Sequence, residues 1–158
     1  MGSSTSQKSF LNFKVIFLLV SLFLTGSMMR YLSPAQKLDS RPYYSFEQAS
    51  SYLNGLSEIQ KENYLHAEYF DFWFLINYSW LSWLALKKYL PKKNLKWLAI
   101  IPGGLDFFET ALITWYLMTG SLNVLHQLLP VLSSCKWLSG VLITLYLLKT
   151  IFWRKAKV

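Results

Sequence analysis

The sequence predicts an all-α fold, a four-helix transmembrane bundle with a short amphipathic helix in its first outer segment. The first reason is composition: 53% of the 158 residues are hydrophobic and only 15% are charged, which is apolar-rich and charge-poor for a soluble domain. The second reason is four long stretches without Asp, Glu, Lys or Arg, at 15–29, 72–86, 110–135 and 137–148. A bilayer core requires about 20 mainly apolar residues per helix. With their flanks, the stretches predict spans at 11–32, 70–89, 96–118 and 132–153.

The third reason is the placement of the basic residues, which also predicts the topology. The net charge of +8 would suit a nucleic-acid partner, but the lysines and arginines crowd before the first span, between the second and third, and after the fourth. The crowded residues are Lys8, Lys14, Lys87, Lys88, Lys92, Lys93, Lys96, Lys149, Arg154, Lys155 and Lys157. The positive-inside rule places such segments in the cytoplasm. Both termini are therefore predicted to be cytoplasmic, residues 33–69 and 119–131 to lie outside, and nucleic acid is not an expected partner.

The first predicted span, 11–32, resembles the beginning of a secretory signal. Lys8 and Lys14 precede a strongly apolar run, as the charged and apolar regions of a signal peptide do. Met28 and Met29 prolong that run, and no Ala-x-Ala cleavage site follows. We expect an uncleaved signal anchor; cleavage would leave three spans with the same orientation.

The outer segment between the first two spans contains signals for one short helix. Ser45 and Gln48 have the spacing of a capping box, and Asn54-Gly55 is a typical helix stop. Apolar residues repeat between them at helical spacing: Phe46, Ala49, Tyr52, Leu53 and Leu56. This pattern predicts an amphipathic helix over 45–56 that lies on the outer interface or caps the bundle.

The third predicted span carries two acids, Asp106 and Glu109. Three residues turn an α-helix by about 300°, so the two carboxyl groups share a face. A rise of about 1.5 Å per residue places Asp106 near the bilayer midplane and Glu109 one turn nearer the outer surface. A charge near the bilayer centre costs on the order of 3 kcal/mol, so the pair is expected to have a partner or a task. Pro102, followed by Gly103, is expected to kink the span.

Other polar residues are predicted at similar depths in the neighbouring spans. Asp71 lies near the outer boundary of the second span and Asn77 at the depth of Glu109, while Lys136 and Ser139 lie at comparable depths in the fourth. The predicted polar cluster is Asp71, Asn77, Asp106, Glu109, Thr110, Lys136 and Ser139. Acids outnumber the single lysine, so at least one carboxyl group should be protonated at neutral pH through desolvation and like-charge repulsion.

The sequence contains no motif for common catalytic or metal chemistry: no serine elbow, zinc-binding helix, paired-cysteine motif or phosphate loop. His66 and His126 both fall outside the predicted spans, which disfavours haem between helices. Glu62 and His66 share a helical face, but no second cluster completes a metal site, and a solvated contact between them is favoured. No metal site is predicted, and the sequence identifies no cofactor.

Parts of the chain resemble a group of small, mostly bacterial, four-span membrane proteins of unknown function. In that group an Asp opens the second span, Asp-x-x-Glu lies in the third, and Lys-Trp opens the fourth. The matching residues here are Asp71, Asp106, Glu109, Lys136 and Trp137, whereas Thr110 departs from the usual Asn. The resemblance, which covers about two thirds of the chain, implies no activity. The expected location is the bacterial inner membrane.

Three functions remain open from the sequence. The favoured one is a membrane protein whose polar cluster binds a small amphipathic ligand, a lipid or another membrane subunit. An alternative is an enzyme acting on a lipid or isoprenoid substrate, with Asp106 and Glu109 as an acid–base pair and Lys136 setting their charge. The third is a structural ion pair that fixes helix packing. The lipid bilayer is an expected partner in every case.

Overall fold

The computed structural model describes residues 3–33, 37–89, 94–121 and 123–155. All regular secondary structure in these ranges is helical, with no strand, so the all-α prediction is confirmed. The α-helices are α1 (Ser3–Leu32), α2 (Phe46–Asn54), α3 (Glu58–Tyr89), α4 (Ile100–Thr119) and α5 (Leu129–Lys155); the 3₁₀ helices are η1 (Asn94–Ala99) and η2 (Val124–Leu128).

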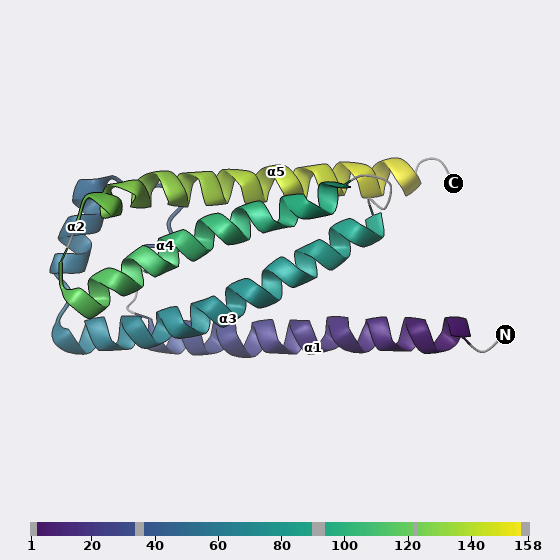
Figure 1. Cartoon of the computed structure of the whole chain (residues 1–158), viewed down its shortest axis with the longest axis horizontal. Coiled ribbons are helices and arrows are strands. Elements are labelled where there is room, and N and C mark those ends of the chain that lie inside the picture. Colours follow the sequence, from purple (N-terminus) through teal and green to yellow (C-terminus); the bar gives the residue numbers. More distant parts are fainter. Residues whose placement is uncertain (1–2, 34–36, 90–93, 122, 156–158) are drawn as a thin grey trace.

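The four long helices run lengthwise, and α2 lies across the end opposite to both chain termini (Figure 1). α1 packs on α3, α3 on α4, and α4 on α5, whereas α3 and α5 are largely separated from each other. α1 and α5 therefore form the two outer sides of the molecule. The charged residues discussed below lie toward the end that α2 covers.

Three segments are long and apolar enough to cross a membrane: Phe13–Leu32, Trp97–Thr119 and Val124–Thr150. Large apolar side chains are exposed along them, among them Phe23 at 74% and Leu145 at 58%. Apolar exposure on this scale is typical of a surface in contact with lipid. These features indicate a membrane protein.

The second predicted span, 70–89, does not reach the same standard. It forms part of α3, but α3 is not among the helices apolar enough to cross a membrane. The reason is composition, because Asn77, Ser79 and Ser82 interrupt the apolar run and Asp71 and Lys87 lie at its ends. The absence of charge in 72–86 does not offset the effect of these neutral polar residues on the hydropathy of the helix.

α4 begins differently from the predicted span 96–118. Residues 94–99 form η1, and the α-helix starts at Ile100, so Pro102 falls in its first turn. Proline is tolerated there because the first backbone N–H groups of a helix have no partner within it. The expected kink is therefore replaced by a change from 3₁₀ to α-helix. A Cβ on Gly103 would overlap Ser79 Oγ of α3, so this glycine allows the close approach of α3 and α4.

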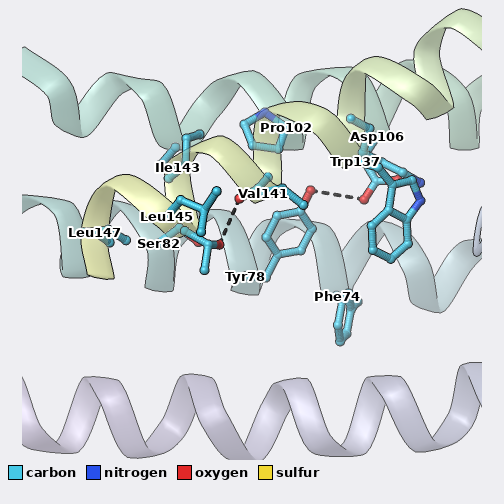
Figure 2. A pocket seen from close by; sticks show the side chains of 14 residues that line it. Phe74, Tyr78, Ser82, Pro102, Asp106, Trp137, Val141, Ile143, Leu145 and Leu147 are labelled. Atoms are coloured by element: carbon cyan, nitrogen blue, oxygen red, sulfur yellow. Dashed lines mark hydrogen bonds and ion pairs between the residues drawn. The ribbon is translucent and has the colours of Figure 1, made fainter. Parts of the chain in front are cut away.

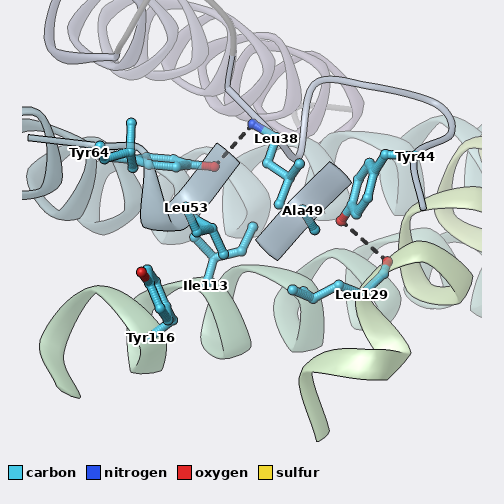
Figure 3. Close-up of a cluster of buried hydrophobic side chains, with 9 residues drawn as sticks. Leu38, Tyr44, Ala49, Leu53, Tyr64, Ile113, Tyr116 and Leu129 are labelled. Atoms are coloured by element: carbon cyan, nitrogen blue, oxygen red, sulfur yellow. Dashed lines mark hydrogen bonds between the residues drawn. The ribbon is translucent and has the colours of Figure 1, made fainter. Parts of the chain in front are cut away.

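α2 closes the end of the helix array. Ser45 caps it, and both hydrogen bonds of the capping box with Gln48 are present. Its buried face contributes Ala49 and Leu53 to a core with residues of the connecting segment, α3, α4 and α5 (Figure 3). The other buried members are Leu38, Tyr44, Leu56, Tyr64, Ile113, Tyr116 and Leu129. This core fixes the segment between α1 and α2 against the helices.

Candidate functional site

Five side chains form a first polar cluster, which we call the Lys136 cluster: Tyr44, Tyr78, Asp106, Glu109 and Lys136. Lys136 Nζ lies 2.9 Å from Asp106 Oδ1 and 2.6 Å from Glu109 Oε2. α4 supplies both acids on one face, and α5 packs against that face. The lysine therefore forms an ion pair with each carboxyl group of the Asp-x-x-Glu pair.

Each of these acids also accepts a hydrogen bond from a tyrosine. Tyr44 donates to Glu109 Oε1 at 2.7 Å, and Tyr78 donates to Asp106 Oδ2 at 3.1 Å. Burial and the charge of Glu109 raise the pKa of Tyr44 above its ordinary value, so its hydroxyl keeps its proton and remains a donor. Hydrogen bonds to ionised groups are among the stronger ones in proteins.

The ammonium group of Lys136 is already surrounded by acceptors, with which a further ligand would compete. It carries three N–H bonds, and three acceptors surround it: Asp106, Glu109 and the backbone carbonyl of Asp39 at 2.9 Å. An anionic group that entered here would have to displace one of them. The Lys136 cluster is therefore unsuited to holding a phosphate or carboxylate ligand.

Four side chains form a second polar cluster, which we call the Lys37 cluster: Lys37, Asp39, Glu68 and Asp71. Lys37 Nζ lies 3.0 Å from Asp39 Oδ2, 2.8 Å from Glu68 Oε1 and 3.9 Å from Asp71 Oδ2. None of the four residues is more than 8% exposed. Burial alone would lower the pKa of Lys37, but the charges of Asp39, Glu68 and Asp71 raise it above its ordinary value. Lys37 is therefore an ammonium ion.

Glu68 is the acid of this cluster with the fewest partners. It is fully buried, and neither carboxyl oxygen has a hydrogen bond among the described residues; Oε1 has only the ion pair with Lys37. Burial and the neighbouring charge of Asp39 raise the pKa of Glu68 well above its ordinary value, against the opposing effect of Lys37. Glu68 therefore holds a proton far more readily than an exposed glutamate does.

Two contacts join the clusters. Thr110 of α4, next in sequence to Glu109, donates to Asp71 Oδ2 at 3.0 Å. Asp39 supplies its side chain to Lys37 and its backbone carbonyl to Lys136. The connecting segment is held further by Ser133 Oγ, which donates to the Arg41 carbonyl at 2.8 Å, and by the Leu38 N–H, which donates to Tyr64. The segment that connects α1 and α2 is thus part of the site.

A cavity of about 630 Å³ opens beside the Lys136 cluster, between α3 and α5 (Figure 2). Tyr78, Asp106 and Lys136 form its polar part. The rest of the wall is mainly apolar: Phe74, Ser82, Ala99, Pro102, Trp137, Gly140, Val141, Ile143, Thr144, Leu145 and Leu147. The volume is within the range of small-molecule sites. Glu109 does not line the cavity and is fully buried.

The structure brings together five of the seven residues predicted for the cluster: Asp71, Asp106, Glu109, Thr110 and Lys136. It does not bring in the other two. Asn77 donates to Ser21 of α1 and to the Trp73 carbonyl, each at 2.8 Å. Ser139 donates to the Lys136 carbonyl on its own helix. The estimate of depth alone did not determine which neighbour the face of the helix that carries Asn77 meets.

Five members of the two clusters were not predicted from the sequence: Lys37, Asp39, Tyr44, Glu68 and Tyr78. A signal for Tyr78 exists, because it lies seven residues after the predicted Asp71, and seven residues are close to two helical turns. Glu68 lies on the adjoining part of that face. Lys37, Asp39 and Tyr44 had no comparable signal, since they precede α2 in a segment without helical periodicity.

Carboxyl oxygens of Asp39, Glu68 and Asp71 lie within 4.8 Å of one another, which is the spacing of a small metal site. Lys37 Nζ occupies the position of the cation among them. The chain matches no protein-family model, no curated protein and no solved structure. These comparisons do not contradict the resemblance to small four-span membrane proteins. Function is therefore inferred from geometry.

Proposed function

We propose that this chain is a polytopic membrane protein that binds a small amphipathic ligand in the cavity between α3 and α5. Four helices would cross the bilayer: the three apolar segments together with the part of α3 at 70–89. The positive-inside rule supports cytoplasmic termini and a cytoplasmic link between α3 and α4. A bacterial inner membrane is the location that the four-span resemblance favours.

One observation carries this proposal: the cavity joins a long apolar wall to a compact polar end. Residues of α5 from Gly140 to Leu147 form much of the apolar wall, and Tyr78 and Asp106 form the polar end. A ligand with a tail and a small head would match both parts. α4 contacts both α3 and α5, while α3 and α5 are separated, which leaves the cavity accessible from the side.

The polar end favours a neutral head that donates a hydrogen bond. Lys136 donates hydrogen bonds to Asp39 and Asp106 and forms an ion pair with Glu109, so an anionic head would compete with three acceptors there. Asp106 is already compensated by Lys136, so a cationic head gains little. Carboxylate oxygens accept more than one hydrogen bond, and a hydroxyl could join Tyr78 on Asp106. A long-chain or isoprenoid alcohol fits these conditions.

Photocrosslinking tests the proposal. The purified protein in detergent micelles is exposed to a long-chain alcohol carrying a diazirine in its tail, and the labelled residues are mapped by mass spectrometry. We expect labelling to concentrate on α5 between residues 137 and 147. Gly140→Phe should abolish it, because Gly140 lines the cavity and a Cβ there meets nothing within 4 Å.

Leu138→Phe is the matched control, since Leu138 lies on the same helix, is 60% exposed and does not line the cavity. This variant should label as the wild type does. Labelling spread evenly over the exposed faces of α1, α4 and α5, and unaffected by Gly140→Phe, would contradict a specific ligand site. The exposed faces would then be better explained by association with another membrane subunit.

Catalysis on a lipid or isoprenoid substrate is a second candidate, and one observation favours it: Asp106 and Tyr78 line the cavity beside its apolar wall. Glu109 is buried behind them, so only Asp106 of the acid pair could contact a substrate. Asp106→Asn retains the shape and removes the charge. A variant that still binds the alcohol but changes the lipid composition of the cell would support catalysis, whereas unchanged lipids would support binding alone.

A further inference from the structure

The Lys37 cluster contains more buried negative charge than its lysine can compensate. With Asp39, Glu68 and Asp71 ionised, three negative charges would face one ammonium ion. The four residues are 0–8% exposed, and transferring an uncompensated charge out of water is costly enough that a buried group usually neutralises instead. A charge of this kind requires either a bound cation or a proton.

The hydrogen bonds identify which acid lacks stabilisation. Tyr64 donates to Asp39 Oδ1 at 3.5 Å, and Thr110 donates to Asp71 Oδ2 at 3.0 Å. Glu68 has no such donor, and its Oε2 has neither a hydrogen bond nor an ion pair among the described residues. Two acids therefore have a hydroxyl donor, and the third, which is fully buried, has none.

We propose that Asp39, Glu68 and Asp71 form a proton-binding site. At neutral pH a proton bound to Glu68 neutralises that carboxyl group, and Lys37 compensates one of the two remaining carboxylates. The proton converts the Glu68 carboxylate into a carboxyl group with one O–H donor. Oxygens of Asp39 and Asp71 lie within 4.8 Å of an oxygen of Glu68, so the neighbouring acids are the available acceptors. The inference does not depend on the ligand proposed for the cavity.

The groups that face Glu68 come from every element packed around it. The connecting segment supplies Lys37 and Asp39, α3 supplies Tyr64 and Asp71, and α2 supplies Tyr52, over whose ring Arg41 of the connecting segment lies at 5.2 Å. The charge of Asp106 in α4 repels that of Asp71. Lys136 of α5 contacts the cluster by donating a hydrogen bond to the backbone carbonyl of Asp39. Lys37 is the cation nearest to Glu68, at 2.8 Å, and its charge is divided among three acids.

Infrared spectroscopy of the full chain tests the site. In a detergent without ester or acid groups, the C=O stretch of a protonated carboxyl group is separate from the carboxylate and amide bands. We expect such a band at neutral pH in the wild type and its loss, in whole or in large part, in Glu68→Gln. Glu62→Gln is the control, because Glu62 is an exposed acid on the same helix, and it should leave the band unchanged.

A second measurement keeps the proposal testable if Glu68→Gln fails to fold. Labelling the glutamate carboxyl groups with ¹³C should shift the band of the wild type to lower frequency. The absence of a protonated carboxyl band in the wild type would overturn the proposal. So would a band that the ¹³C label does not move, or one that persists at full intensity in a folded Glu68→Gln protein.

Discussion

The two lysine–carboxyl clusters of this protein contain the same kinds of groups and differ in how well these are satisfied. In the Lys136 cluster, each acid has a direct ion pair with the lysine and a tyrosine donor. In the Lys37 cluster, three acids share one lysine, and Glu68 has no hydroxyl donor among the residues that the structure describes. Burial is similar in both. The number of donors per carboxyl group is therefore what separates them.

This difference assigns different properties to the two clusters. A buried ion pair whose partners are all satisfied tolerates no loss of a member, because removal leaves an uncompensated charge. A cluster with too few donors gains when one acid becomes neutral. Removing a charged group of the Lys136 cluster should thus lower the free energy of unfolding. Neutralising Glu68 in the Lys37 cluster should lower it little or not at all.

Lys136→Met should have the largest effect. It leaves Asp106 and Glu109 without their counter-ion and removes the donor to the Asp39 carbonyl, and breaking such a buried pair costs about 3–5 kcal/mol. Thermal or denaturant-induced unfolding in detergent micelles measures this. Lys149→Met, at an exposed lysine on the same helix, should be close to neutral. Equal effects of the two variants would show that Lys136 reaches solvent or lipid headgroups instead.

The pair Glu109→Gln and Glu68→Gln tests the comparison directly. Glu109→Gln weakens a charged hydrogen bond from Tyr44 and the ion pair with Lys136, at a cost of about 1–3 kcal/mol. Glu68→Gln imitates the protonated acid and should leave the free energy of unfolding at neutral pH unchanged or higher. A loss at Glu68 as large as the loss at Glu109 would mean that both clusters depend on ionised acids.

A third prediction concerns the contact between α3 and α4 that holds both clusters in register. Gly103→Ala should destabilise the protein by about 1–3 kcal/mol, because the added methyl group overlaps Ser79. Gly104→Ala is the matched control: a Cβ there meets nothing within 4 Å, and alanine is favoured over glycine inside a helix by about 0.5–1 kcal/mol. The same unfolding assay compares the two, and similar values would indicate that α3 and α4 do not approach closely.

The smallest expected effect is a pH dependence. Because the pKa of Glu68 in the folded protein is raised above its ordinary value of 4.5, the folded state binds more protons than the unfolded state above that pH. The free energy of unfolding should therefore decrease as the pH rises above 4.5. Midpoint temperatures measured from about pH 5 to about pH 8 should fall more steeply for the wild type than for Glu68→Gln. Parallel curves would remove Glu68 as the source.

The sequence was sufficient for the part of the site that lies on regular helices. Asp106 and Glu109 share a face because of their spacing, and Lys136 was placed beside them by depth. Asn77 was misplaced because it lies six residues after Asp71, which turns it about 240° away on the helix and toward α1. An estimate of the angle about the helix axis between Asp71 and Asn77, added to the estimate of depth, would have excluded Asn77 from the predicted cluster.

The Lys37 cluster was not predictable by the same means. Lys37 and Asp39 lie before the helix predicted over 45–56, in a segment without helical periodicity, and irregular segments usually remain at the surface. Their burial depends on α2, which closes the end of the helix array, and on partners in α3 and α5 that are far away in sequence. No local pattern encodes such a contact.

The attachment of the connecting segment to α5 also sets an order of assembly. The carbonyls of Asp39 and Arg41, and the hydroxyl of Tyr44, find their partners at Lys136, Ser133 and Leu129, near the beginning of the last helix. During synthesis the segment is made long before these partners exist. The contacts of this segment with α5 therefore form only after the last helix has been made, so the Lys136 cluster is completed late in biogenesis.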